Sequence, residues 1–224
     1  MLSSVGAAGA ALLADALRVN VALTSLDLAC NSIDHAGATQ LAECLRDSNS
    51  TLKSLGLKRN HIGCEGATSM AEALRVNTSL ISLDLSYNRI GADGATQLAD
   101  ALRTSALVSL NLGGNSFRAA GVAKLLDCLL VNATLTSLDL GYCNLSGFNG
   151  EGTTRLVDCL RVNQALQTLK LEGNALGPVG AAQLAEWLRT NKTITCLDLT
   201  ENTIGDEGCS RLAMLSASTP RSRA

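Results

Sequence analysis

The chain has 224 residues, of which 46% are hydrophobic, so it is long and apolar enough to bury the core of one large domain. Eighteen basic and twenty acidic side chains leave a formal net charge of -2 at pH 7, which argues against nucleic acid or an anionic membrane as a partner. No uncharged apolar run is long enough to span a bilayer, and eight cysteines without a CxxC pair favour reduced thiols and a cytoplasmic location.

The first predicted element is a helix over residues 5–20, whose Gly/Ala/Leu pattern returns further along the chain. A predicted strand precedes each later copy of this pattern, but none precedes the first copy. We therefore expect a leading half repeat over residues 5–22 that has a helix and no strand of its own.

From residue 23 onward, one unit recurs at separations of 29, 28, 27, 28, 31 and 28 residues. Its leucine spacing reads LxxLxLxxN, followed by an apolar residue two positions later. A fixed period of this length is the signature of a repeat architecture, because single units cannot bury their own apolar faces. The units begin near residues 23, 52, 80, 107, 135, 166 and 194, and their asparagine position holds Asn31, Asn60, Asn88, Asn115, Cys143, Asn174 and Asn202.

Each unit changes its hydrophobic period halfway through. Leu26, Asp27 and Leu28 alternate in polarity, which predicts a short strand with one buried face. In residues 94–103 the apolar residues recur every three or four positions, which predicts a helix. Strands joined through helices lie parallel, and the wider helices force the stack to curve with its strands inside. We therefore predict an α/β fold, a right-handed horseshoe-shaped solenoid with parallel strands on the concave face and helices on the convex face.

Several small or bulky residues have predicted packing roles. Phe117 lies in a core column and is expected to be buried. Trp187 replaces the small residue of its helix column, so it either fills space near the last helix or is exposed there. A glycine precedes each helical stripe, and we expect this column to allow close backbone approach between neighbouring units. The column consists of Gly9, Gly37, Gly66, Gly94, Gly121, Gly152, Gly180 and Gly208.

Residues that often carry chemistry also favour structural roles in this chain. Cys44, Cys128 and Cys159 share a helix column that requires small apolar side chains. His35 and His61 fall in corresponding loops, without a second ligand at metal-binding spacing. Four of the five Asn-x-Ser/Thr sequences, all except the one at Asn144, fall in a column that ends each helix, so a turn explains those four better than glycosylation. We therefore predict no metal, cofactor or catalytic group.

The unit LxxLDLxxNxIGxxGAxxLAxxLRxN, matched by residues 80–103 as far as its arginine, resembles the leucine-rich repeats of the ribonuclease-inhibitor type. Its 28-residue class is also similar to the repeat arrays of NLR-type immune receptors and of Ran GTPase-activating protein. The resemblance covers roughly residues 5–215, and it implies one leucine-rich-repeat domain over residues 1–215 with a disordered tail at 216–224. It implies a recognition scaffold, so the specific function depends on the exposed columns.

One exposed column is the fifth position of each unit, on the predicted concave face. Glu172, Glu201, Lys58 and Arg59 follow at the seventh and eighth positions, which leaves six acidic against three basic side chains over these positions. This acidic face indicates a docking surface for a basic protein or peptide. The alternative is that aspartate only keeps this position solvated. The fifth-position residues are Asp27, Gly56, Asp84, Asn111, Asp139, Lys170 and Asp198.

Aromatic anchors are scarce, which directs attention to the end of the predicted strands. Tyr87 and Tyr142 share the eighth position, where Arg59 stands one unit before Tyr87. Because tyrosine and arginine dominate binding hot spots, this strand-to-loop edge is the predicted contact site. An insertion at residues 146–151, with Phe148 as its only large apolar group, is either a binding loop or tolerated drift.

The sequence therefore predicts a non-catalytic protein–protein interaction module that binds through its acidic concave face and its strand-to-loop edge. The alternatives are a GTPase-activating protein of the Ran GTPase-activating type and a ligand-sensing fragment of an NLR-type receptor. Leucines such as Leu12 and Leu215 lie at the two ends of the stack, so either a cap is missing or the ends associate. The predicted contact residues are Asp27, Arg59, Asp84, Tyr87, Asn111, Asp139, Tyr142, Lys170, Glu172 and Asp198.

Overall fold

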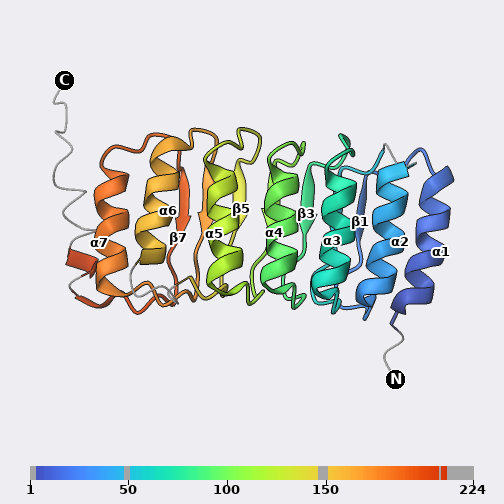
Figure 1. Ribbon diagram of the computed structural model, residues 1–224, viewed down its shortest axis with the longest axis horizontal. Helices are drawn as coiled ribbons and strands as arrows, with labels where there is room; N and C mark the ends of the chain where they lie inside the picture. The colour runs from blue at the N-terminus through green and yellow to red at the C-terminus, as the bar shows by residue number, and fades with distance from the viewer. Residues whose placement is uncertain (1–3, 48–50, 146–150, 207, 211–224) are drawn as a thin grey trace.

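The computed structural model describes residues 4–47, 51–145, 151–206 and 208–210. It begins with helix α1, before the first strand (Figure 1). Strands and helices then alternate along the described chain. The elements are α1 (Gly6–Val19), β1 (Ser25–Asp27), α2 (Asp34–Asp47), β2 (Ser54–Gly56), α3 (Gly63–Leu74), β3 (Ser82–Asp84), α4 (Gly91–Leu102), β4 (Ser109–Asn111), α5 (Arg118–Leu129), β5 (Ser137–Asp139), α6 (Glu151–Val162), β6 (Thr168–Lys170), α7 (Gly177–Leu188) and β7 (Cys196–Asp198).

The strands of the described residues form one parallel sheet in chain order, from β1 to β7. Each strand pairs in register with the equivalent residues of the next unit, so Ser25 lies opposite Ser54 and Asp27 lies opposite Gly56. The helices stand side by side in a second layer, in front of the strands in Figure 1. This arrangement confirms the predicted α/β solenoid, with parallel strands on the concave face and helices on the convex face.

The core lies between the two layers. In the third unit, Leu80, Leu83, Leu85 and Ile90 are at most 1% exposed. Burying each such side chain contributes about 1.5–3 kcal/mol, and the same columns continue through the neighbouring units. Phe117 is buried in this core, as predicted.

Trp187 is also buried, which decides in favour of the packing role that the sequence left open. The predicted insertion, apart from its last residue, and the predicted tail at 216–224 lie outside the described residues.

The asparagine position of each unit joins that unit to the one before it. The Oδ1 atom of Asn60 accepts the backbone N–H groups of Asn31 and Ile33, at 2.9 and 3.3 Å. Its Nδ2 atom donates to the carbonyl groups of Leu28 and Leu57, at 2.8 and 3.0 Å. Asparagine suits this buried position because it offers both donors and acceptors to the backbone.

A second asparagine column ends the helices. The Oδ1 atom of Asn77 accepts the backbone N–H groups of Ser79 and Leu80, while its Nδ2 atom donates to the carbonyl of Leu45 in the preceding unit. Equivalent turns occur at Asn132 and at positions further along the chain. These bonds account for the column as a structural turn.

The fifth unit has Cys143 where the other six have asparagine. Its Sγ atom lies 3.4 Å from the carbonyl oxygens of Leu112 and Gly141, and the backbone N–H of Asn115 faces it. Sulfur is a weak acceptor, so the hydrogen-bond ladder is weakest between the fourth and fifth units.

The glycine column marks close contact between helices. A Cβ atom on Gly94 would lie 2.6 Å from Cγ2 of Ile90 and 3.1 Å from the Cβ of Ala67, both of which are fully buried. This geometry confirms the close approach that the sequence analysis expected.

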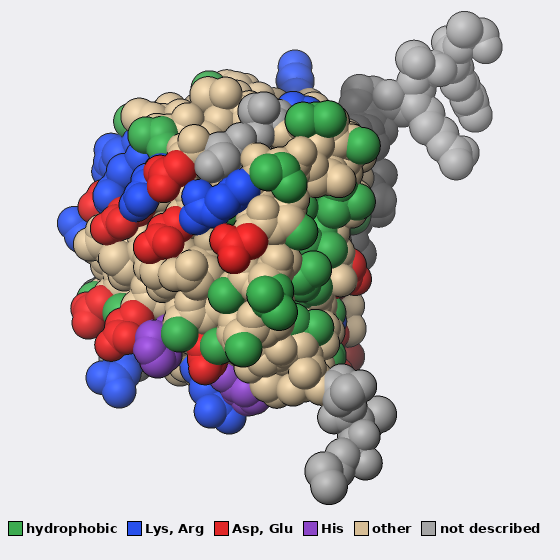
Figure 2. All heavy atoms as spheres, turned by 90° about the vertical axis from the view of Figure 1, so that its right-hand side faces the viewer, with side chains coloured by type: hydrophobic (Ala, Val, Ile, Leu, Met, Phe, Trp, Pro, Cys, Tyr) green, Lys and Arg blue, Asp and Glu red, His purple; other side chains and the backbone are tan. Residues whose placement is uncertain are grey.

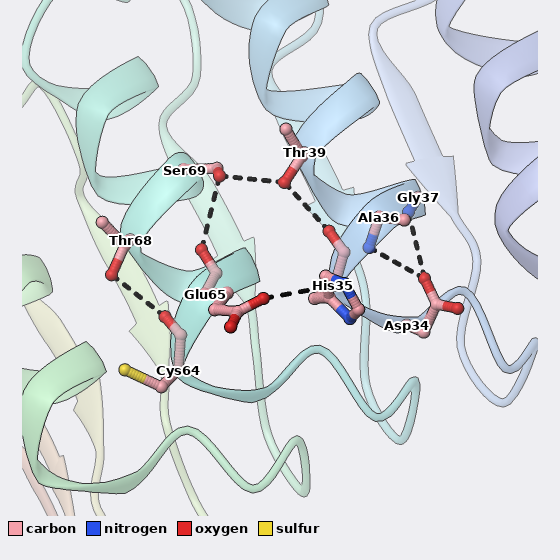
Figure 3. Close-up of polar contacts among 9 residues, drawn as sticks. All are labelled: Asp34, His35, Ala36, Gly37, Thr39, Cys64, Glu65, Thr68 and Ser69. Carbon is pink, nitrogen blue, oxygen red and sulfur yellow. Dashed lines mark hydrogen bonds and ion pairs between the residues drawn. The ribbon is translucent and has the colours of Figure 1, made fainter.

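Polar side chains connect neighbouring helices at the surface. Figure 3 shows the contacts between α2 and α3, where the hydroxyl groups of Thr39 and Ser69 lie 2.9 Å apart and His35 lies 3.6 Å from Glu65. Asp34 accepts two backbone N–H groups at the start of α2 (Figure 3). The imidazole of His35 and the carboxylates of Glu65 and Asp34 therefore each have a partner within the protein on the convex side.

Apolar side chains gather on the end of the stack that carries α1, which faces the viewer in Figure 2. Leu12 is 71% exposed, Val19 81% and Val21 84%. Within the described residues, no helix combines the length and apolarity that a bilayer crossing requires.

Candidate functional site

The in-register sheet aligns nine of the ten predicted contact residues into two columns, and Glu172 lies at the seventh position, next to the second column. The inner column is the fifth position of each unit, which ends each strand on the concave face, and the edge column is the eighth position, in the turn that follows. All ten predicted residues lie at the surface, half-buried or exposed. The inner column holds Asp27, Gly56, Asp84, Asn111, Asp139, Lys170 and Asp198, and the edge column holds Cys30, Arg59, Tyr87, Gly114, Tyr142, Gly173 and Glu201.

The aspartates of the inner column hold the turns that follow their strands. The Oδ1 atom of Asp84 accepts the backbone N–H and the hydroxyl of Ser86, at 2.8 and 2.6 Å. Asp198 accepts the same pair of groups from Thr200, and these hydrogen bonds lower the pKa of Asp198 below its ordinary value. One carboxylate oxygen of each is therefore used within the chain.

Two inner aspartates also contact a neighbour in the next unit. The Nδ2 atom of Asn111 donates to Oδ2 of Asp84 at 3.2 Å, and the Nζ atom of Lys170 lies 3.8 Å from Oδ2 of Asp139. Lys170 therefore partly offsets the charge of Asp139, whereas Asn111 is an uncharged amide that adds only a hydrogen bond to Asp84. The sequence did not predict these contacts.

The edge column has a different backbone conformation. Arg59, Tyr87, Tyr142 and Glu201 all have positive φ angles, between 53° and 57°. Side chains other than glycine and asparagine rarely adopt this left-handed region, and here the repeated turn imposes it. The turn thus holds bulky and charged side chains at the edge in fixed positions.

Each tyrosine ring lies over a glycine of the following unit. A Cβ atom on Gly114 would lie 2.5 Å from Cδ1 of Tyr87, and one on Gly173 would overlap the ring of Tyr142. Any other residue at these glycines would displace the rings. Although Tyr87 and Tyr142 remain 37% and 39% exposed, their rings are well placed as rigid contact surfaces.

The two tyrosines have surroundings of opposite charge. The guanidinium Cζ of Arg59 lies 4.9 Å from the ring centroid of Tyr87, and the Nζ atom of Lys58 lies 5.5 Å from it, which are cation–π distances. The hydroxyl of Tyr142 lies 3.0 Å from Oε1 of Glu172 and 2.9 Å from Oε2 of Glu201. These carboxylates raise the pKa of Tyr142, so its phenol stays protonated.

Sequence reasoning missed four members of this candidate site. Lys58 and Glu201 entered only a count of charges, and the glycines beneath the rings were not connected with the tyrosines. The signal was present, because Gly114 and Gly173 each stand one unit after a tyrosine in the same column.

Cys30 is the one cysteine in the edge column, and the other cysteines and both histidines lie outside that column. Cys128 and Cys143 are buried, and burial raises the pKa of both thiols to about 12. His35 and His61 are both exposed, as predicted, but His35 is the second residue of helix α2 and not a loop residue. No group of three potential metal ligands occurs among the residues that the structure describes.

Comparison with known proteins identifies the same repeat unit. A family model described as Leucine Rich repeat matches residues 19–42, 48–71, 76–99, 131–147, 162–185 and 190–213, which is more than half of the chain. No curated protein matches the chain in a sequence search.

Two solved structures share the fold at low identity. The leucine-rich repeat-containing protein LegL7 from Legionella pneumophila is 24% identical, with a TM-score of 0.64 over 92% of this chain and 66% of that one. The C-terminal domain of tropomodulin from Caenorhabditis elegans is 16% identical, with a TM-score of 0.55 over 80% of this chain and 90% of that one. With its seven in-register parallel strands and the matched repeats, the chain belongs to the leucine-rich repeat family and is of the ribonuclease-inhibitor-like type.

Proposed function

We propose that this chain is a non-catalytic binding module that holds a segment of a partner protein across its concave face and along its strand-to-loop edge. The observation that carries the proposal is the pair of exposed tyrosines at the edge, each placed over a glycine of the next unit. Tyrosine supplies a large contact area with little loss of side-chain freedom, so preordered rings of this kind favour binding.

The concave face supports a partner with basic groups. Asp27, Asp84, Asp139 and Asp198 line one column, with Lys170 as the only cation in it. One oxygen of each aspartate serves its own turn, and the second oxygens of Asp84 and Asp139 contact Asn111 and Lys170. The second oxygens of Asp27 and Asp198 are therefore the main acceptors that the column offers to a cation. We expect this charge to steer a basic segment toward the face rather than to provide most of the affinity.

Affinity purification followed by mass spectrometry tests the proposal. The wild-type chain is compared with Asp84→Lys and Tyr87→Ala, and Glu72→Lys on the convex helix α3 serves as the control. We expect Glu72→Lys to retain the captured protein, and we expect Asp84→Lys and Tyr87→Ala to lose it. A partner that all three variants retain would contradict the proposed surface.

A GTP-hydrolysis assay with the captured partner tests the alternative of a GTPase-activating protein. GTPase activation, which the resemblance to Ran GTPase-activating protein suggested, requires that the purified chain accelerate multiple-turnover GTP hydrolysis by a captured GTPase. An unchanged hydrolysis rate with an intact complex would support the binding module.

We also propose that two copies associate through the end of the stack that carries α1. Leu12, Val19 and Val21 lie there with most of their surfaces exposed, and an apolar surface of this kind is stabilised by burial. The outer edge of β1 lies at the same end, because β1 is paired on one side only, with β2.

A further inference from the structure

The charge of the strand-to-loop edge changes sign from one end to the other. Lys58 and Arg59 lie in the second unit, and Glu172 and Glu201 lie in the sixth and seventh units. Arg89, exposed shortly after Tyr87, adds to the positive end. The seventh and eighth positions between the two ends are uncharged, and they are Ser86, Tyr87, Gly113, Gly114, Gly141 and Tyr142.

The positive end leaves its cations available to a partner. Arg59 and Lys58 contact the ring of Tyr87 at 4.9 and 5.5 Å from the centroid, so their charged groups are oriented by an aromatic face. A carboxylate that approaches this end can bind the guanidinium while the ring contact is kept, because the guanidinium carries several N–H donors.

The negative end has more acceptors than donors. The hydroxyl of Tyr142 lies within 3.0 Å of carboxylate oxygens from both Glu172 and Glu201, yet its single hydrogen can serve only one of them at a time. An ammonium or guanidinium group from a partner would supply the missing donors and neutralise both charges.

We infer that this edge binds an extended protein segment whose two ends carry opposite charges, with an acidic side chain over Lys58 and Arg59 and a basic side chain over Glu172 and Glu201. This inference rests on the proposed function and names its partner. Five strand spacings separate Arg59 from Glu201, which is about 24 Å. An extended chain covers that distance in about seven residues, with apolar or aromatic side chains over the two tyrosines.

A synthetic peptide of about nine residues tests the inference. It carries two glutamates at one end, two arginines at the other, and tyrosine and leucine in the centre, and its termini are blocked. The control peptide has the same composition with the glutamates and arginines alternating. In fluorescence anisotropy at low ionic strength, we expect the bipolar peptide to bind at least about tenfold more tightly than its control.

Charge reversal of the chain provides the matched controls. Two double variants give both ends of the edge the same charge, namely Lys58→Glu with Arg59→Glu and Glu172→Lys with Glu201→Lys. Each double variant should lose about tenfold in affinity for the bipolar peptide. The quadruple variant has both ends reversed, so it should bind the peptide in the opposite direction with nearly the wild-type affinity. Thermal unfolding monitored by circular dichroism checks that all variants fold.

Equal affinity for the two peptides, or no recovery in the folded quadruple variant, would overturn the inference. Its failure differs from failure of the proposed function. If Tyr87→Ala abolishes capture of the protein partner and the charge reversals do not, the binding module stands and the bipolar segment is wrong. If none of these variants affects capture, the proposed function itself fails.

Discussion

Cys143 is the single departure from asparagine in the ladder that joins the units. From the second unit onward, asparagine at this position accepts two backbone N–H groups from the preceding unit, as Asn88 does from Asn60 and Ile62. The thiol of Cys143 offers only a weak acceptor to the backbone N–H of Asn115, and it lacks the amide N–H donors of an asparagine side chain. The fourth and fifth units are therefore held together less firmly than their neighbours.

We predict that Cys143→Asn stabilises the fold, because it restores amide hydrogen bonds at a buried position. The expected gain is about 1 kcal/mol, or about 2–4 °C in unfolding temperature for a chain of this size. The reciprocal variant, Asn88→Cys, should lose about 1–3 kcal/mol. Urea unfolding of both variants checks this, and a destabilised Cys143→Asn would show that the ladder cannot accept an amide there.

The buried thiols predict how stability depends on alkaline pH. Burial raises the pKa of Cys128 and Cys143 to about 12, above the ordinary value of 9.0. Below pH 9 both thiols are protonated in the folded and the unfolded chain, so their contribution to stability is fully present. Between pH 9 and about pH 12 only the unfolded chain ionises, and each thiol lowers stability by about 1.4 kcal/mol per pH unit.

Urea unfolding at pH 8 and at pH 10.5 measures this loss. Replacing both thiols, by Cys128→Ala and Cys143→Asn, should reduce the loss of stability between the two pH values. An identical loss in the wild type and the double variant would mean that other groups account for it.

At the scale of the element, the glycine near the start of each helix decides how closely consecutive helices pack. An alanine in place of a helical glycine ordinarily stabilises by about 0.5–1 kcal/mol. At Gly94 the added methyl group would overlap Ile90 and crowd Ala67, and neither side chain has space to move. Packing therefore opposes the helix preference at this position.

We predict that Gly94→Ala destabilises the chain by about 1–3 kcal/mol and that Gly94→Val does so further. Gly91→Asn is the matched control, because a Cβ atom there meets nothing within 4 Å and asparagine tolerates its positive φ of 68°. Thermal unfolding compares the three variants. Full stability of Gly94→Val would show that the helices can separate without cost.

At the scale of the whole molecule, the curved stack leaves two kinds of exposed surface. The concave side and its edge are polar and carry the predicted contact residues, while the end near α1 is apolar (Figure 2). A solenoid has no closed core, and within the described residues no further unit packs against the outer side of α1.

We predict that the chain associates as its concentration rises, and that Leu12→Glu with Val21→Lys returns it to a monomer. Both substitutions place charge on the exposed apolar end, whereas Val76→Lys, at the end of α3 and 59% exposed, serves as the control. Size-exclusion chromatography with light scattering measures the mass. A wild-type chain that stays monomeric at high concentration would contradict the proposed association.

Much of the fold could be predicted because a repeat multiplies each local signal. Leu83 and its equivalents mark the apolar strand face in all seven units, and the five between the two ends are fully buried. Residues such as Phe117 could be assigned to the core from their column alone. The two alternatives for Trp187 could not be separated, since a single substitution in a column does not show whether its neighbours leave space.

The candidate site was less accessible to sequence reasoning. Position in the unit placed Tyr87 and Tyr142 at one edge, but the direction of each ring depends on its left-handed backbone and on the glycine of the next unit. Asp84 and Asp139 were predicted as exposed charges, whereas the structure gives each a neighbour one unit away.

The amino-acid sequence by itself determined the architecture, because regular leucine spacing leaves only one way to bury every apolar face. Tertiary structure alone decided which charges are neutralised, which rings are supported and how the edge divides into a positive and a negative end. These features depend on side-chain contacts between units that are about 28 residues apart, as in the contact of Tyr142 with Glu172, and such contacts follow from three-dimensional register and not from local pattern.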